Sequence, residues 1–507
     1  MNETIRLQKI NEVYFRIYAN PGIIDEMHDH FSFRPKNFQF DPRFKANAWD
    51  GYLHLVDRRY NTIYRGLIKE IEKFAKEREY GLEHDDVDKE AIDNQIIDDF
   101  ISTLKLPFPL RDAQLNCIRL GINEHKRLFL SPTSSGKSLI LYVLTRYWKQ
   151  ERDRDKKALI IVPRINLITQ MHGDFLDYAR NDPVFNSSFI HEICAGHEKY
   201  TDKPIVISTW QSLYQLDRAF FEQFDFVCCD EAHNAKADSL KKILSNCTAA
   251  EWRFGMTGTL DESKCNEMVI QGLTGPVYQA TTTKEEIAKN NIAQMNPITC
   301  LVMKYTEEEA NELRKFAAKK ENKKEAYRKE IEFIISNERR NKFIRNLAID
   351  LKGNTIIMFQ FVQKHGRIIY DLIFEKLKGT DRKVFFVHGG TDNEDRELVR
   401  TITEQESNAI IVASVGVFGT GTNIKKLDNL IFASPSKSLI RVLQCIGRIL
   451  RLSTKDKVAN VFDMADDLTS KRHKNFGVKH LLERTKIYDK QGFEYRIVSV
   501  KLYNKAS

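Results

Sequence analysis

The sequence predicts an α/β protein in which a small α+β domain precedes two successive parallel-sheet units. Apolar runs of strand length alternate with amphipathic helical stretches from residue 104 to about 280, and the same alternation resumes from residue 354 to about 464. Runs that are apolar throughout are typical of parallel sheets covered by helices on both faces. The length of 507 residues suits about three domains.

The expected elements can be placed in order along the chain. Residues 1–100 hold short alternating segments at 12–19 and 51–57, a helical pattern at 64–79, and an acidic stretch at 81–100 that we interpret as a domain boundary. The predicted strands of the first unit are RLFLSP, ALIIVP, PIVIST, FDFVCCD and RFGMTGT; those of the second are NTIIMF, KVFFVH, AIIVAS, NLIFASP and VANVFDM. A helical pattern without Pro or Gly fills residues 307–350. The predicted domains are 1–100, 101–282 and 283–507.

Composition excludes several classes of protein. Hydrophobic residues make up 42% and charged residues 29%, which is typical of a globular chain and excludes a disordered one. No run approaches the ~18 apolar residues of a membrane span, and the first residues carry no export signal, so we expect no membrane and a cytoplasmic location. The eight cysteines form no CxxC pair and are expected to be buried thiols. The net charge of +9 suits a polyanionic partner.

A predicted phosphate-binding loop follows the first strand of the first unit. Small residues let backbone N–H groups surround a β-phosphate at a helix N-terminus, Lys137 reaches the β- and γ-oxygens, and the Ser138 hydroxyl ligates Mg²⁺. The loop departs from the general GxxxxGK[ST] pattern at its first position, which is Ser131. Its predicted ATP-binding residues are Ser131, Pro132, Thr133, Ser134, Ser135, Gly136, Lys137 and Ser138.

An acidic pair follows another apolar strand about ninety residues later. FDFVCCDEAH places Asp230 and Glu231 at a strand tip, where ligand sites of α/β sheets form. Asp230 is expected to hold Mg²⁺ through water, and Glu231 to orient and deprotonate the water that attacks the γ-phosphate. Together with the loop, this pair predicts a site that binds and hydrolyses ATP.

A third signal lies on a helical stretch of the second unit. Gln444, Arg448 and Arg451 stand at i, i+4 and i+7, which places all three on one helix face. Arginines suit a γ-phosphate that gains charge in the transition state, where such groups are typically worth ~10³ to 10⁵ in rate. We therefore predict Gln444, Arg448 and Arg451 as catalytic residues.

These motifs resemble those of the superfamily 2 helicases. SPTSSGKS, VPRINLITQ, DEAH, GMTGTL, VFGTGTNI and QCIGRILR stand in that family's order and spacing over about residues 105–465. The resemblance implies two tandem RecA-like domains, with Arg111 and Gln114 of FPLRDAQ reading the adenine. It also implies that His233, Thr257 and Thr259 couple the nucleotide state to nucleic acid. Residues that match the family's backbone-binding segments are Arg164, Thr209, Gly421 and Asn423.

Three positions depart from the common family pattern. Ser134 stands where many members have Gly, Asn423 where many have Asp, and Cys445 where many have Arg. None of these removes a predicted catalytic group. Ser134 is expected to stiffen the loop slightly. Because position 445 is Cys, Arg448 and Arg451 are expected to contact the γ-phosphate without a third arginine.

Two basic segments outside the motifs carry open alternatives. Residues 31–69 hold eight Lys or Arg against three Asp or Glu, together with nine aromatics. They form either an accessory nucleic-acid surface, with Trp49, Arg58 and Arg59 as its candidates, or the core and solvated rim of a small domain. The 307–350 segment is either a basic arm over duplex DNA or a solvated helix with Glu/Lys pairs four residues apart.

The whole chain resembles the branch of this superfamily that serves recombination and repair in T-even bacteriophages. That resemblance implies an ATP- and Mg²⁺-dependent DNA helicase of 3′ to 5′ polarity that regresses forks, migrates four-way junctions and unwinds RNA–DNA hybrids. It also implies single-stranded DNA as a ligand, a monomer in an infected bacterial cell, and leaves a small phage partner protein open. The alternatives are a nucleotide-switched clamp that holds or anneals DNA, a translocase that does not unwind, and the translocase subunit of a restriction system.

Overall fold

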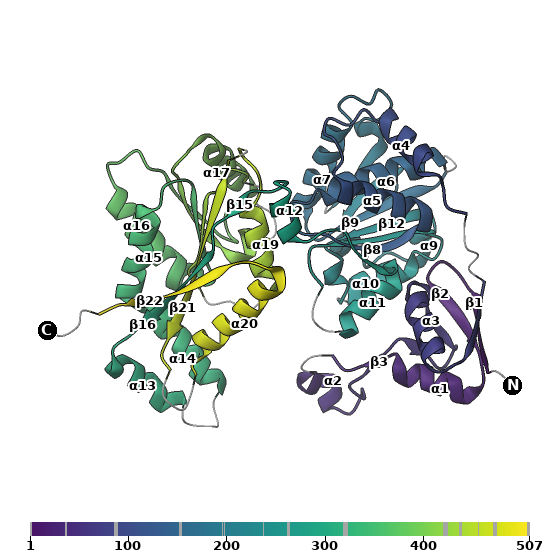
Figure 1. The fold of residues 1–507 in the computed structure, drawn as a ribbon, viewed down its shortest axis with the longest axis horizontal. Coiled ribbons are helices and arrows are strands. Elements are labelled where there is room, and N and C mark those ends of the chain that lie inside the picture. The colour runs from purple at the N-terminus through teal and green to yellow at the C-terminus, as the bar shows by residue number, and fades with distance from the viewer. Residues whose placement is uncertain are drawn as a thin grey trace. The chain divides into compact units, whose positions relative to one another are not determined.

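The computed structural model describes residues 3–35, 38–85, 90–151, 155–194, 196, 198–236, 238–260, 264–317, 323–418, 424–434, 439–454, 456–469 and 474–503. The chain forms two compact units, residues 1–281 and 282–507 (Figure 1). The first unit contains a small N-terminal sheet and a parallel sheet, and the second contains another parallel sheet. The predicted fold class is thereby confirmed: two RecA-like parallel-sheet domains follow a small α+β domain.

The N-terminal domain is built on a five-stranded mixed sheet in the order β5-β6-β2-β1-β7. In β1, Ile5 and Leu7 are buried whereas the residues on either side of them are exposed, so one face covers the core. The elements are β1 (Thr4–Lys9), β2 (Tyr14–Tyr18), α1 (Pro21–His30), β3 (Ser32–Phe33), α2 (Pro42–Lys45), β4 (Leu53–His54), β5 (Val56–Asp57), β6 (Thr62–Tyr64), α3 (Ile68–Glu77) and β7 (Gly81–His84). Because β7 pairs with β1, the acidic stretch predicted as a boundary begins as a strand of this sheet.

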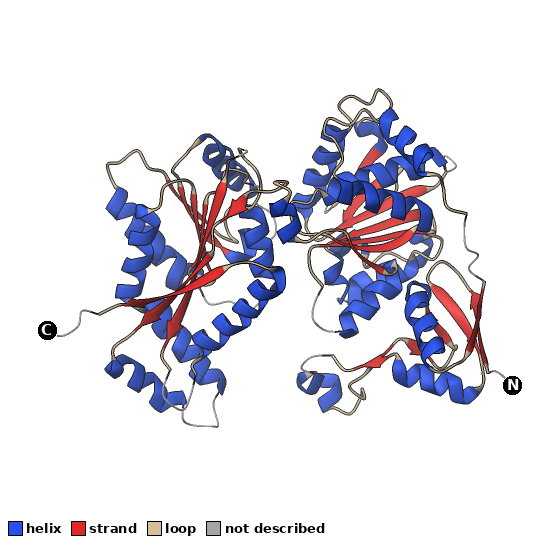
Figure 2. Cartoon of the chain, in the orientation of Figure 1, coloured by secondary structure: helices blue, strands red, loops and turns tan. Residues whose placement is uncertain are grey.

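The first parallel sheet has the order β10-β11-β9-β12-β13-β8-β14. It contains every strand predicted for this unit, and β10 and β14 are additional edge strands. The elements are α4 (Asn94–Thr103), α5 (Asp112–Glu124), β8 (Lys126–Leu130), α6 (Lys137–Glu151), β9 (Lys157–Val162), α7 (Ile165–Tyr178), β10 (Ile190–Ile193), β11 (Ile205–Thr209), α8 (Trp210–Leu213), α9 (Arg218–Phe221), β12 (Phe224–Asp230), α10 (Asp238–Asn246), β13 (Trp252–Thr257), α11 (Lys264–Thr274) and β14 (Val277–Gln279). Helices cover both faces of the sheet (Figure 2), which explains its almost wholly buried strands.

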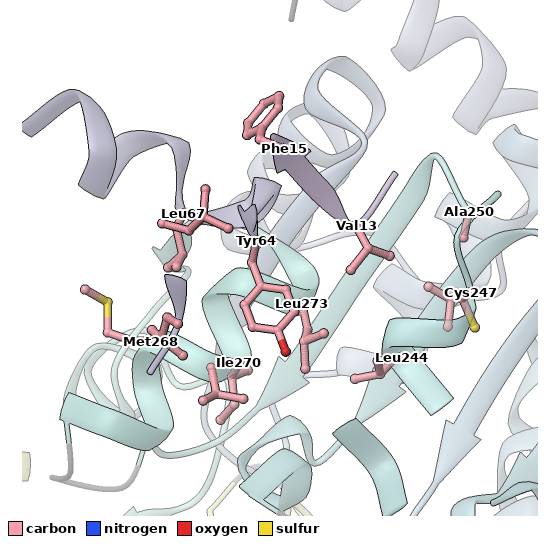
Figure 3. Close-up of a cluster of buried hydrophobic side chains, with 14 of the residues drawn as sticks. Val13, Phe15, Tyr64, Leu67, Leu244, Cys247, Ala250, Met268, Ile270 and Leu273 are labelled. Atoms are coloured by element: carbon pink, nitrogen blue, oxygen red, sulfur yellow. The ribbon is translucent and has the colours of Figure 1, made fainter. Parts of the chain in front are cut away.

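The N-terminal domain shares a hydrophobic core with the first parallel-sheet domain. Val13, Tyr64 and Leu67 lie in one buried cluster with Ile270 and Leu273 of α11 (Figure 3). The contact is close enough to require glycine at position 66 in the 3₁₀ turn Arg65–Leu67, because a Cβ there would lie 2.1 Å from the carbonyl oxygen of Gln271. The two parts of the first unit are therefore fused by packing.

A buried arginine holds the helices beneath this shared core. Arg253, at the start of β13, is almost fully buried. Its guanidinium donates to the carbonyl oxygens of Leu244 and Cys247 near the end of α10, and to that of Leu273 near the end of α11, at 2.7 to 2.8 Å. Carbonyl groups at helix C-termini lack helical partners, so this one side chain satisfies three of them.

The second unit contains a parallel sheet in the order β18-β19-β17-β20-β21-β16-β22, with the short β15 beside β21. All five strands predicted here are present, and β15, β16 and β22 are additional. The elements are α12 (Thr283–Ala288), β15 (Gln294–Met295), β16 (Ile298–Lys304), α13 (Glu307–Ala317), α14 (Lys323–Ser336), α15 (Glu338–Asp350), β17 (Thr355–Phe359), α16 (Arg367–Leu377), β18 (Val384–Val387), α17 (Asn393–Gln405), β19 (Ile410–Ser414), α18 (Val415–Phe418), β20 (Asn429–Phe432), α19 (Leu439–Ile449), β21 (Val458–Asp467), α20 (Phe476–Gln491) and β22 (Tyr495–Lys501).

The 307–350 segment corrects one expectation. Its described residues, 307–317 and 323–350, form three helices, and α15 begins after Asn337, whose side chain accepts a hydrogen bond from the Arg340 backbone N–H. An ion pair joins Lys342 to Glu338 four residues before it, as the solvated-helix alternative expects, and another joins Arg328 to Glu325 three residues before it. Lys319 and Lys320 lie outside the described residues.

Candidate nucleotide site and its coupling network

The predicted phosphate-binding loop connects β8 to the N-terminus of α6. Ser131 donates its backbone N–H to the Thr257 carbonyl oxygen at 2.9 Å, and its hydroxyl lies 2.6 Å from that of Ser135. Ser134 has φ 71° and Gly136 has φ 82°. A non-glycine residue at such an angle costs about 1 to 2 kcal/mol, so the departure at Ser134 places strain in the loop. The loop has the form of an anion site at a helix N-terminus.

Lys137 points back into this loop. Its Nζ donates to the carbonyl oxygens of Ser131 and Pro132, at 3.1 and 3.2 Å. The neighbouring Thr133 is half-buried in the same loop. A phosphate bound by the loop would therefore contact the Lys137 ammonium group on the concave side of the loop backbone.

The adenine-reading candidates brace the loop from α5. Gln114 is buried; its Nε2 donates to the Ser135 carbonyl oxygen at 2.9 Å, and its Oε1 accepts from the Arg111 backbone N–H at 2.9 Å. A Cβ on Gly136 would lie 2.2 Å from that same Nε2, so this position requires glycine. The Gln114 amide is thus engaged by the protein at both ends, and its role in reading adenine stays a prediction.

The acidic pair lies at the carboxyl end of β12, two strands from β8. Burial and then the neighbouring Glu231 carboxylate raise the pKa of Asp230 to about 6, against the opposing effect of Lys137. Glu231 has φ 50°, a left-handed conformation that is uncommon for a residue with a side chain and often marks a functional site. Two adjoining carboxylates therefore stand where water cannot fully screen them.

These residues fit the Mg²⁺ that the family resemblance implies. Magnesium prefers hard oxygen donors and commonly takes one or two from the protein, with the rest from phosphates and water. Asp230 offers a half-buried carboxylate and Ser138 a hydroxyl at the start of α6. The raised pKa of Asp230 marks a place where a divalent cation would relieve repulsion between like charges.

The three coupling candidates form a connected chain with Glu231. His233 Nδ1 lies 3.2 Å from Glu231 Oε2 and 3.0 Å from Thr257 Oγ1. Thr257 Oγ1 in turn donates to the Thr259 carbonyl oxygen at 2.8 Å. Since Ser131 also bonds to Thr257, one strand end joins the phosphate loop to the acidic pair.

One residue at this site was missed by sequence reasoning. The Tyr178 hydroxyl, from the end of α7, lies 2.8 Å from Ser138 Oγ. Burial raises the pKa of Tyr178 well above its usual value, so the phenol stays protonated. A tyrosine at the end of an amphipathic helix gives no local signal, because the contact depends on how α7 crosses α6.

The backbone-binding candidates of the first unit lie at the same edge of its sheet. Arg164 precedes α7 and is exposed, whereas Thr209 is buried at the end of β11 with its hydroxyl 3.1 Å from Ser212 Oγ. Parallel strands end together, so these residues share an edge with the phosphate loop and the acidic pair. Gly421 and Asn423 lie outside the described residues.

In the second unit, the predicted helix ends earlier than expected. Gln444 and Arg448 lie on α19, half-buried, but the helix ends at Ile449, so Arg451 follows it instead of continuing its face. A hydrogen bond from the Arg451 N–H to the Arg448 carbonyl oxygen, at 3.3 Å, keeps the two close, and the Arg448 guanidinium lies 5.7 Å from the Phe418 ring centroid. Cys445 is fully buried, which explains why an uncharged residue suits this position.

The N-terminal candidates lie elsewhere in the first unit. Trp49 is half-buried; its indole N–H donates to the Tyr52 carbonyl oxygen at 2.6 Å, and the Arg43 guanidinium lies 5.3 Å from its ring. Arg58 is exposed and paired with Asp25, and the exposed Arg59 lies 5.2 Å from the Tyr60 ring. Basic groups and aromatic faces therefore adjoin one another on this surface.

Three family profiles match the chain. Their descriptions are "DNA helicase UvsW, N-terminal" over residues 4–85, "Type III restriction enzyme, res subunit" over 82–262, and "Helicase conserved C-terminal domain" over 338–453. The motifs identified in the sequence from Gln114 to Thr259 fall within the second match. None of the described helices has the length and apolar character needed to cross a bilayer.

Individual relatives extend the similarity over almost the whole chain. The ATP-dependent DNA helicase UvsW of Enterobacteria phage T4 is 33% identical, with 96% of this chain and 98% of that protein covered. The crystal structure of T4 UvsW, at 31% identity, covers 99% of this chain and 100% of its own, with a TM-score of 0.51. The DNA 3′-5′ translocase XPB2 of Sulfurisphaera tokodaii is 24% identical, with 77% of this chain and 89% of that protein covered.

Proposed function

The chain belongs to the UvsW family of ATP-dependent DNA helicases and is an ATP-hydrolysing enzyme, and from this premise we propose that it remodels branched DNA. Its proposed reactions are fork regression, branch migration of four-way junctions and unwinding of RNA–DNA hybrids, with 3′ to 5′ polarity. The observation that supports a motor most directly is the chain of contacts from the phosphate loop through Thr257 and His233 to Glu231. Through such contacts, a change in the bound nucleotide can shift the other residues at the same edge of the sheet.

In this proposal, Lys137 holds the β- and γ-phosphates and Glu231 takes a proton from the attacking water. Ser138 and Asp230 hold the Mg²⁺, which neutralises phosphate charge in the transition state when it is bound. The left-handed backbone at Glu231 and its 3.2 Å contact with His233 fix the carboxylate's direction. Gln444, Arg448 and Arg451 of the second unit act on the γ-phosphate, where the fixed guanidinium charge of the two arginines is most effective.

Thr257 and Thr259 are proposed to transmit the structural change that accompanies ATP hydrolysis at Glu231 to the bound nucleic acid. Arg164 and Thr209 hold the sugar-phosphate backbone at the same sheet edge, and Gly421 and Asn423 do so in the second unit. Trp49, Arg58 and Arg59 form the accessory nucleic-acid surface, which the neighbouring charges and rings support. Arg111 and Gln114 are proposed to set the choice of ATP while bracing the loop.

The proposed setting follows from the phage relative. A monomer acts on forks, four-way junctions, single strands and RNA–DNA hybrids in the cytoplasm of an infected bacterium, during recombination, repair and replication. A small phage protein as a further partner stays open. The alternative of a clamp that holds or anneals DNA has less support, because a clamp does not need a base such as Glu231 for hydrolysis.

The test compares ATPase rates of the native chain, Lys137→Ala and Glu231→Gln with no nucleic acid, single-stranded DNA, linear duplex, a fork, a four-way junction and an RNA–DNA hybrid. We expect branched or hybrid substrates to stimulate hydrolysis most, and Glu231→Gln to lower kcat about 10² to 10⁴-fold while nucleotide still binds. The matched control is Glu222→Gln, an exposed carboxylate of the same domain. Stimulation that does not depend on the substrate would refute branch specificity, and none at all would favour the clamp.

Unwinding and annealing assays separate the two function classes further. Under the helicase proposal, Glu231→Gln abolishes strand separation on a labelled fork and traps ATP. Under the clamp alternative, strand holding or annealing by the same variant survives and no strand separation is seen with the native chain either.

A further inference from the structure

The hydroxyl of Ser138 has a second protein group beside it. Tyr178 Oη lies 2.8 Å from Ser138 Oγ, within hydrogen-bond distance, and the two residues belong to different helices, α7 and α6. The Tyr178 ring packs 5.8 Å from the Tyr142 ring, one turn further along α6, and lies against the core between the helices. This packing fixes the phenol in space independently of the phosphate loop.

A serine that ligates a metal must send its proton away from the metal. The hydroxyl has one proton and two lone pairs, and a cation is bound by a lone pair. With the proton directed at a fixed acceptor, a lone pair is already aimed before the metal arrives. Without that acceptor, the hydroxyl rotates freely, and binding has to include the cost of orienting it.

We propose that Tyr178 is a positioning residue that accepts the Ser138 proton and so turns a lone pair of Ser138 Oγ toward the Mg²⁺ of the bound nucleotide. The inference rests on the proposed role of Ser138 as a magnesium ligand. Tyr178 touches neither nucleotide nor metal in this arrangement, because it acts through Ser138. The phenol oxygen has lone pairs and lies 2.8 Å from Ser138 Oγ, so it can accept this proton.

The opposite arrangement makes the opposite prediction. If Tyr178 donated its proton to Ser138, it would occupy one of the two lone pairs of Ser138 Oγ and leave the serine proton free to turn toward the metal, so it would oppose Mg²⁺ binding. Removal of the phenol hydroxyl would then strengthen magnesium-dependent binding. The sign of the effect therefore separates positioning from competition.

The experiment measures the affinity of the full-length chain for a fluorescent ADP analogue in excess Mg²⁺ and in excess EDTA. Tyr178→Phe keeps the ring and removes only the hydroxyl. We expect it to weaken binding in Mg²⁺ about three- to tenfold and to leave binding in EDTA unchanged. The magnesium concentration for half-maximal ATPase should rise by a similar factor, with kcat at saturating Mg²⁺ nearly constant.

Two further variants make the result specific. Tyr142→Phe is the matched control, because Tyr142 is a buried tyrosine in the same ring cluster and should leave magnesium-dependent affinity unchanged. Ser138→Ala should remove most of the magnesium effect, and adding Tyr178→Phe to it should cause no further loss. Such non-additivity is the signature of one residue acting through another.

The outcomes overturn different statements. Equal weakening in Mg²⁺ and EDTA would make Tyr178 a merely structural residue, tighter magnesium-dependent binding would make it a competitor, and no change would remove it from the site. Each of these refutes the inference while Ser138→Ala still loses magnesium-dependent affinity. If Ser138→Ala itself has no such loss, the proposed role of Ser138 fails instead.

Discussion

Glu12 offers a sharp test of how the N-terminal domain is held. Its carboxylate pairs with three cations: Lys9, Arg65 and, at 2.8 Å, Lys126 on the strand that leads into the phosphate loop. Burial, and then the charge of the nearby Arg65, lower the pKa of Lys126 to about 8, because the Glu12 carboxylate offsets only part of these effects. We predict that Glu12→Gln destabilises the first unit, since it leaves Arg65 and Lys126, which are mostly buried, without their anion.

The pKa of Glu12 sets the magnitude. Burial would raise this pKa, but the charge and hydrogen bond of Lys126, with those of Lys9 and Arg65, lower it from 4.5 to about 2. A gap of roughly 2.5 pKa units is worth about 3 kcal/mol at 1.36 kcal/mol per unit. Because the folded pKa is depressed, this stabilisation is complete above pH 4.5 and is lost as the pH falls toward 2. About 2 kcal/mol of it should be gone at pH 3.

The assay is urea unfolding followed by tryptophan fluorescence. All four tryptophans lie in the first unit, at positions 49, 148, 210 and 252, so the signal is specific to that unit. At pH 7 the free energy of unfolding should fall by about 3 kcal/mol in Glu12→Gln. Between pH 5.5 and pH 3, the native chain should lose about 2 kcal/mol more than the variant.

Two comparisons complete this test. Glu12→Gln combined with Lys126→Met should recover part of the loss, because Lys126 then no longer lacks its anion and the buried Arg65 still does. Glu222→Gln, at an exposed site, should change stability by less than about 0.5 kcal/mol. Equal stability of Glu12→Gln and the native chain at pH 7, or parallel pH profiles of the two, would refute the reasoning.

Three further substitutions probe other parts of the chain. Gly66→Ala should lower the free energy of unfolding of the first unit by about 1 to 3 kcal/mol in the tryptophan assay, because its Cβ would meet the Gln271 carbonyl. Gly136→Ala should weaken binding of a fluorescent ADP analogue at least about tenfold, because both its φ of 82° and its contact with Gln114 exclude a side chain. Burial, and then the charge of Arg340, lower the pKa of His365 to about 3, so this side chain is neutral in the folded chain and the free energy of unfolding falls as the pH drops below 6.5. Between pH 7 and pH 5, His365→Gln should lose about 2 kcal/mol less of this free energy than the native chain, measured by circular dichroism.

Each of these has an outcome that contradicts it. Gly173→Ala is the control for both glycines, because a Cβ there meets nothing within 4 Å, and it should stabilise helix α7 by about 0.5 to 1 kcal/mol. Unchanged stability of Gly66→Ala would mean that the two parts of the first unit are not tightly packed there. If Gly136→Ala bound the nucleotide with native affinity, the loop would not be part of the nucleotide site. An unaltered pH profile in His365→Gln would mean that another group is titrating.

The parallel sheets were predictable because the sequence pattern of their strands is distinctive. The run ALIIVP is apolar at every position, and FDFVCCD is apolar except for Asp225 and the terminal Asp230. Only a strand buried on both faces needs such a pattern. The loop at 131–138 and the pair Asp230 and Glu231 follow such runs directly, so their meeting at one sheet edge was predictable. Strand β22 was missed because most of its residues are exposed and its alternation is weak.

Features that depend on tertiary contacts were not predictable in the same way. The break before α15 comes from a side-chain cap by Asn337, and neither Pro nor Gly marks it. Tyr178 meets Ser138 only because α7 crosses α6, forty positions along the chain. Tyr64 and Leu67 have the apolar character of any small domain's core, and nothing local shows that their neighbours belong to α11.

The shared core limits how the chain can be shortened. Residues 3–85 hold a complete sheet, which invites expression of that segment alone. A cut after it would expose Val13, Tyr64 and Leu67 on one fragment and Ile270 and Leu273 on the other. Each such side chain is worth roughly 1.5 to 3 kcal/mol when buried, and a contiguous apolar patch promotes self-association. The smallest fragment that keeps its own surface intact is therefore residues 1–281.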